Sequence, residues 1–213
     1  MQQIFLSHSK ADYEIINIFR NSFEGTEVHP ILMEYEQFSN PPWLAIRNNI
    51  ENSSALFVLL SNNLKISDYT QNWVSYEIGI ADEANREIWM FEDVNNQVIF
   101  PIPNVHHYML YNPAQWDSLN YLKTIIHSYA LNLKGALGLG LLTYLALTNP
   151  ALAILGALAG SKINVPNKPV GIAITCPYRN CNVSFQYHSI VQVIRCPSCR
   201  QPFQINIQNY PNY

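Results

Sequence analysis

The chain of 213 residues is long enough for one full domain with smaller attachments, and with 48% hydrophobic residues it can bury a core. Charged residues make up only 13%, and the net charge of -3 excludes a general electrostatic attraction to nucleic acid. The charge is uneven, because residues 161–213 contain no Asp or Glu and carry +5, which leaves -8 on the rest of the chain.

Apolar runs alternate with amphipathic segments through the first 133 residues. The patterns predict strands at residues 3–8, 28–35, 55–60, 87–91 and 97–103 and helices at residues 9–25, 40–53, 72–86 and 114–133. Ser9 is the expected N-cap of the first helix, and Gly25 is its expected stop. Pro30 places the second strand at a sheet edge or at its own start. The uninterrupted run ALFVLL at residues 55–60 is typical of a parallel strand buried on both faces, so the alternation predicts a doubly wound α/β sheet.

Trp73 and Glu77 lie four residues apart and therefore on one face of the predicted third helix. Ligands of open parallel sheets bind beyond the carboxyl ends of the strands, where Ser7, His8 and Ser9 follow the first strand. A carboxylate in that cleft can bind a ribose diol and stabilise positive charge on a sugar ring, as glycosidic cleavage requires. The alternative is a core helix face whose glutamate serves the helix dipole.

The segments IFLSHSKAD, AIRNNIENSSALFVLLSNN and NWVSYEIGIA resemble a Toll/interleukin-1 receptor (TIR) domain of the prokaryotic kind over residues 1–132. The resemblance implies a flavodoxin-like sheet of five parallel strands. In enzymatic members of the family, a glutamate four residues after a tryptophan cleaves the nicotinamide–ribose bond of NAD, and here Glu77 takes that catalytic place. Residues 35–43 correspond to the BB loop, which gates the site or contacts a neighbouring subunit. The resemblance implies these substrate-binding residues: Ser7, His8, Ser9, Tyr35, Trp43 and Trp73.

The function that this resemblance implies is that of an NAD nucleosidase, a hydrolase of N-glycosyl bonds, or an ADP-ribosyl cyclase. Its setting would be microbial, antiphage-like defence or stress signalling, with self-association through the TIR domain. A non-enzymatic TIR scaffold remains an alternative. So does a zinc-ribbon sensor of nucleic acid or of a partner protein, for which the basic tail is the only electrostatic support.

Two close cysteine pairs, CPYRNC and CPSC, lie fourteen residues apart near the end of the chain. Paired thiolates on turns predict a structural zinc site that leaves no coordination position open for chemistry. Alternating apolar residues around them predict short strands, and residues 172–207 resemble a zinc ribbon, which we expect to have its own core. Two disulfides and a rubredoxin-like iron site are the alternatives. The predicted ligands are Cys176, Cys181, Cys196 and Cys199.

Residues 135–160 contain no charge, are bracketed by Lys134 and Lys162, and are interrupted by Asn149-Pro150. We expect an apolar helical segment at residues 133–163, which is either one kinked span, a hairpin associated with a membrane, or a hairpin buried in protein. We also expect this segment to drive self-association. Because the N-terminus lacks the pattern of a secretory signal, the expected location is the cytoplasm, with or without membrane association.

Overall fold

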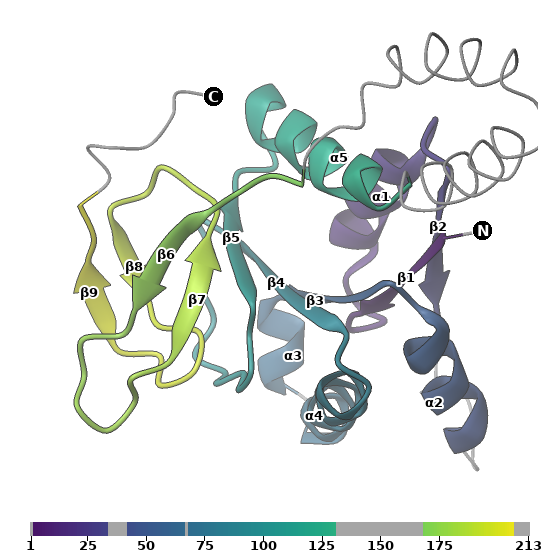
Figure 1. The fold of residues 1–213 in the computed structure, drawn as a ribbon, viewed down its shortest axis with the longest axis horizontal. Coiled ribbons are helices and arrows are strands. Elements are labelled where there is room, and N and C mark those ends of the chain that lie inside the picture. Colours follow the sequence, from purple (N-terminus) through teal and green to yellow (C-terminus); the bar gives the residue numbers. More distant parts are fainter. Residues whose placement is uncertain (1, 34–41, 67, 131–167, 207–213) are drawn as a thin grey trace, which may run out of the picture.

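The computed structural model describes residues 2–33, 42–66, 68–130 and 168–206 (Figure 1). The strands are β1 (Gln2–Ser7), β2 (Val28–Leu32), β3 (Ala55–Leu60), β4 (Glu87–Asp93), β5 (His107–Tyr111), β6 (Ile172–Thr175), β7 (Ser184–Tyr187), β8 (Val193–Arg195) and β9 (Pro202–Gln204). The helices are α1 (Tyr13–Phe23), α2 (Trp43–Asn52), α3 (Asn62–Ile66), α4 (Asp68–Glu83) and α5 (Trp116–Ala130).

A seven-stranded sheet of order β2-β1-β3-β4-β5-β7-β6 forms the centre of the molecule. All its strand pairs are parallel except β6 with β7, and β8 and β9 form a separate antiparallel pair. The mostly parallel α/β architecture is compatible with the predicted flavodoxin-like fold. The expectation that Pro30 marks an edge strand is confirmed, because β2 lies at one end of the sheet.

Helices cover both faces of the sheet, as Figure 1 shows. Successive side chains of a strand point to opposite faces, so Ile4 and Leu6 pack with α1 and α5, whereas Phe5 packs with α2 and α4. Every residue of β3 is buried, as expected for the central parallel strand. The two faces are called below the α1/α5 face and the α2/α4 face.

One predicted strand and several predicted boundaries are wrong, of which the starts of two helices matter most for the site. Residues 97–103 form no strand, and the fifth strand is instead β5, because Pro101 and Pro103 interrupt the more apolar run and cannot donate ladder hydrogen bonds. Helix α1 begins at Tyr13 rather than next to Ser9, although Gly25 does follow its end with a φ of +75°. Helix α4 begins at Asp68, four residues before the predicted start.

The hairpin of β6 and β7 extends the main sheet, so the expectation of a separate core for the tail is wrong. β7 runs parallel to β5, with His107 opposite Gln186, and Figure 1 shows the hairpin beside β5 at the end of the sheet far from β2. Phe185 and Tyr187 belong to the same buried cluster as Phe5. The physical reason is that β5 would otherwise be an open edge, with a row of unpaired backbone groups that β7 now covers.

None of the helices in the described ranges is long and apolar enough to cross a membrane. The apolar segment at residues 135–160 lies outside those ranges, and so does the rest of residues 131–167.

Candidate functional site

Glu77 is buried on the face of α4 that packs against the sheet. Its exposed fraction is 2%, and that of Trp73, one turn earlier, is 7%. Since α4 begins at Asp68, Glu77 lies well past the first helical turn, and the helix dipole does not account for the carboxylate. Moving a carboxylate out of water is costly unless it is hydrogen-bonded, so a buried glutamate on this face is a candidate functional group.

Aromatic rings connect this face of α4 to the surface. Trp43, the first residue of α2, stacks on Trp73 with ring centroids 4.4 Å apart and planes inclined by 22°. Tyr76 meets the Trp43 ring edge-on at 5.0 Å, and Tyr69 lies 6.0 Å from Trp73. Because Trp43 is 48% exposed, the stacked pair runs from solvent to the helix that carries Glu77.

Ser7 ends β1 on the same side of the sheet as this helix. By the alternation along β1, its side chain shares the α2/α4 face with Phe5. Ser7 is 1% exposed, and its Oγ has no hydrogen-bond partner among the described residues. A buried hydroxyl without a partner costs free energy, and a ligand that bonds to it would remove this cost.

Three further residues were predicted for the nucleotide cleft. Ser9 and His8 lie in the turn between β1 and α1, and Tyr35 is not described by the structure. Ser9 forms the turn into α1, where its carbonyl accepts the Asp12 N–H at 3.0 Å, and His8 Nδ1 lies 3.3 Å from the same carbonyl. Tyr35 lies outside the described residues, as do residues 34–41 around it.

Asp12 connects the loops that follow β1 and β3. It accepts hydrogen bonds from Ser61 Oγ and Asn63 Nδ2, both at 2.6 Å, and it is 4% exposed. These loops leave neighbouring parallel strands toward opposite faces, which defines a topological switch point. A cavity of about 460 Å³ lies there, with Asp12 and Asp93 on its wall. The spacing of residues in the sequence could not identify this contact, because the partners of Asp12 lie about fifty positions away along the chain.

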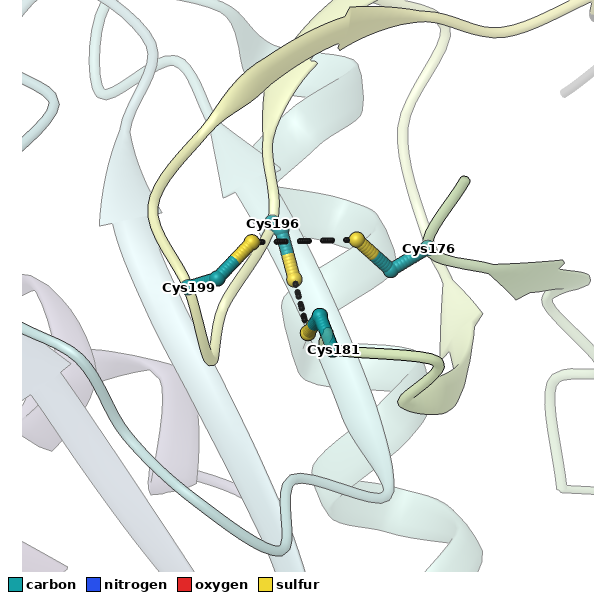
Figure 2. Close-up of side chains that lie close together, drawn as sticks. All are labelled: Cys176, Cys181, Cys196 and Cys199. Atoms are coloured by element: carbon teal, nitrogen blue, oxygen red, sulfur yellow. Dashed lines mark hydrogen bonds between the residues drawn. The ribbon is translucent and has the colours of Figure 1, made fainter. Parts of the chain in front are cut away.

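The four cysteines converge on one point (Figure 2). Their sulfur atoms all lie within 4.8 Å of one another, with Cys176 and Cys199 at 3.7 Å and Cys181 and Cys196 at 3.7 Å. A tetrahedral zinc with bonds of about 2.3 Å would space its sulfurs by about 3.8 Å. A disulfide needs about 2.05 Å, so the arrangement fits a metal ion better than two disulfides.

Both cysteine turns have the same backbone feature. Asn182 follows Cys181 with φ of +49°, and Arg200 follows Cys199 with φ of +58°. In each turn a left-handed residue directly after the second cysteine reverses the chain, which keeps both sulfurs of the pair on the inner side. In the second turn, the Arg200 N–H donates to the Cys196 carbonyl at 2.9 Å.

Arg200 links the second cysteine turn to the main sheet. Its Nη2 lies 2.6 Å from Oε1 of Glu92 near the end of β4, and the two side chains are 3% and 0% exposed. The same carboxylate accepts hydrogen bonds from Tyr108 Oη and from the Val98 N–H, each at 2.5 Å. Backbone contact continues the link, since the Ile102 N–H donates to the Pro197 carbonyl at 2.9 Å. The cysteine cluster is thus attached to the carboxyl end of β4 through a fully buried ion pair.

A second buried polar group joins the hairpin to α5. His188, just after β7, has Nε2 3.0 Å from Nδ1 of His107 and Nδ1 2.8 Å from Oη of Tyr121. The His107 ring stacks on Trp89 with centroids 4.0 Å apart. The spacing of residues in the sequence could not identify this pair, because the partner of His107 lies 81 residues later in the chain.

The two histidines predict a pH dependence of stability. Burial lowers the pKa of His107 to about 4 and that of His188 to about 3, below the value of roughly 6.5 expected in an unfolded chain. Between pH 4 and roughly pH 6.5, these two histidines bind protons in the unfolded chain but not in the folded chain. The free energy of unfolding should therefore fall as the pH drops from 6.5 toward 4, by about 1.4 kcal/mol per pH unit for each histidine.

Urea unfolding at pH 7, 6 and 5 measures this slope. His188→Asn should be less stable at pH 7 but should have a shallower slope. His29→Gln, at an exposed histidine, is the control variant. An unchanged slope in His188→Asn would show that His188 does not bind protons differently in the two states.

Comparison with known protein families found no family model that matches the chain. A search of curated proteins found no match either.

Proposed function

We propose that the chain is a TIR-type NAD glycohydrolase or cyclase, with Glu77 as the catalytic carboxylate. The observation that carries the proposal is a carboxylate 2% exposed on the sheet-facing side of α4, one turn after a tryptophan that stacks on a half-exposed second one. The parallel order β2-β1-β3-β4-β5 is that expected of a TIR sheet and supports the proposal.

In this proposal each group has a defined task. The Glu77 carboxylate accepts hydrogen bonds from the ribose and stabilises the positive charge that develops on the ring as nicotinamide leaves. Trp43 holds an aromatic ring of the substrate by stacking, because its ring reaches solvent, and Trp73 supports the Trp43 ring from the buried side. The Ser7 hydroxyl, buried without a partner among the described residues, donates to a polar group of the nucleotide.

The same carboxylate serves hydrolysis and cyclisation, which differ only in whether water or a group of the substrate attacks the sugar. Incubating the purified full chain with NAD tests the proposal. Release of free nicotinamide together with ADP-ribose or a cyclic product supports it, and the second product identifies which reaction occurs. A non-enzymatic TIR scaffold, the alternative, would leave NAD intact.

We also propose that Cys176, Cys181, Cys196 and Cys199 hold one structural zinc ion. The donor set fits, since four thiolates at tetrahedral spacing suit Zn²⁺ and leave no open coordination position. The ion would offset the cost of placing four thiolates close together, and it would hold both cysteine turns and with them Arg200.

We expect one zinc per chain in protein purified without added metal. Cys196→Ser should reduce the zinc content, whereas Ser198→Ala in the same turn should leave it at one. Because β7 belongs to the main sheet, chelation should lower the melting temperature of the main unfolding transition rather than create a separate one. Metal content near zero, with disulfides by mass spectrometry, would contradict the zinc site.

A further inference from the structure

The addition of β7 to β5 creates a second topological switch point. β5 continues into α5, whose Leu122 and Ile125 pack on the α1/α5 face, whereas β7 continues toward Ile194, which packs on the opposite face. Where neighbouring parallel strands send their connections to opposite faces, a crevice opens beyond their carboxyl ends. A cavity of about 550 Å³ lies at this place, and that size suits a small organic ligand.

The wall of this cavity, called the β5/β7 cavity below, includes the aromatic rings of Trp116 and Tyr121 and one carboxylate among aliphatic and neutral polar residues. Trp116 at the start of α5 is 74% exposed at its wall, and Tyr121 lies five residues further along the helix. Among the described residues that line the cavity, Asp117 is the only one of the types Asp, Glu, Lys and Arg. A ligand here therefore meets aromatic faces and a carboxylate, without a lysine or arginine to balance an anion.

The floor of the cavity is polar but uncharged. His188 is completely buried and hydrogen-bonds to Tyr121 at 2.8 Å and to His107 at 3.0 Å. Its burial, which lowers the pKa of the imidazole to about 3, keeps it neutral at pH 7. Gly171 packs closely against the same imidazole, since a Cβ at this position would come within 2.7 Å of Nε2. The histidine therefore supplies no positive charge to the cavity.

We propose that the β5/β7 cavity binds a small aromatic molecule with a neutral carboxamide or a cationic amidine-like group. Trp116 provides a ring for stacking, and Asp117 accepts hydrogen bonds from an amide or amidinium and repels a carboxylate. No residue of α4, which carries Glu77, lines the cavity, and neither Ser7 nor Trp43 does, so the inference is independent of NAD cleavage and its test uses no NAD.

Benzamide, benzamidine and benzoate test this site, because they share one ring and differ in the charge of a single group. Binding to the full chain is measured by calorimetry at pH 7. We expect benzamidine to bind more tightly than benzamide, because its positive charge is attracted by Asp117, and we expect both to bind at least tenfold more tightly than benzoate. Trp116→Ala should weaken both by about tenfold, since stacking area is lost at a position too exposed to affect folding. Asp117→Asn should remove the preference for benzamidine over benzamide.

Ile99→Ala is the control, because Ile99 is 61% exposed and does not line the cavity. It should leave all three affinities unchanged, and melting curves should confirm that every variant is folded. The proposal is overturned if benzoate binds as tightly as benzamide, if Trp116→Ala binds like the wild type, or if neither benzamide nor benzamidine binds at 10 mM, roughly the weakest affinity that a site of this size should give.

Discussion

Replacing Glu77 by Gln is expected to lower the rate of NAD cleavage by about a hundredfold or more. Glutamine keeps the volume and the hydrogen-bonding capacity of the side chain, but it cannot offset the positive charge that develops on the ribose. The fold should tolerate the change, because an amide is less costly to bury than a carboxylate. The measurement is the initial rate of nicotinamide release, with a melting curve for each protein.

Glu83→Gln is the matched control for this experiment. Glu83 lies on the same helix, is 66% exposed and pairs with Arg47 at 3.0 Å, and a surface ion pair of this kind contributes little to stability. The Glu83→Gln variant should cleave NAD at the rate of the wild type. A folded Glu77→Gln protein that cleaves NAD as fast as the control would exclude Glu77 from catalysis.

Replacing Arg200 by Ala is expected to destabilise the protein by about 3–5 kcal/mol. The change would leave Glu92, 0% exposed, as a buried carboxylate without its cationic partner, and its remaining hydrogen bonds within the described ranges come from Tyr108 and the Val98 N–H. The melting temperature should fall by roughly 6–20 °C for a chain of this length. Arg179→Ala, in the exposed part of the first cysteine turn, should change it little.

Combining Glu92→Gln with Arg200→Ala separates the loss of the ion pair from other effects of Arg200→Ala on stability. Glu92→Gln removes the charge while it keeps an acceptor for Tyr108, so the double variant with Arg200→Ala should be more stable than Arg200→Ala alone. If the two losses are simply additive, the buried pair does not account for the stability, and the link between the cysteine cluster and the sheet is weaker than its geometry indicates.

Features that depend on local spacing could be predicted from the sequence. The run ALFVLL indicated a strand buried on both faces, and β3 is fully buried at the middle of the parallel sheet. The position of Pro30 indicated an edge strand, because proline lacks the N–H that an inner strand needs. The cysteine spacing predicted a four-sulfur cluster, since each pair is brought together by its own turn and only one further contact is needed.

Features that depend on pairs far apart in the chain could not be predicted. The partners Glu92 and Arg200 are 108 residues apart, and His107 and His188 are 81 apart, so no periodicity relates them. Alternating apolar residues indicated that β7 is a strand, but the same pattern suits a small independent sheet and an added strand on β5 equally well. The β5/β7 cavity and the buried ion pair both follow from that one pairing.

The most direct test of the central claim is nicotinamide release from NAD by the purified full chain, with Glu77→Gln measured beside it at the same concentration. The proposed function predicts that nicotinamide accumulates in proportion to wild-type protein, accompanied by an equal amount of ADP-ribose or its cyclic form, and that the variant releases almost none. Intact NAD after prolonged incubation with folded wild-type protein, or equal release by both proteins, would contradict it.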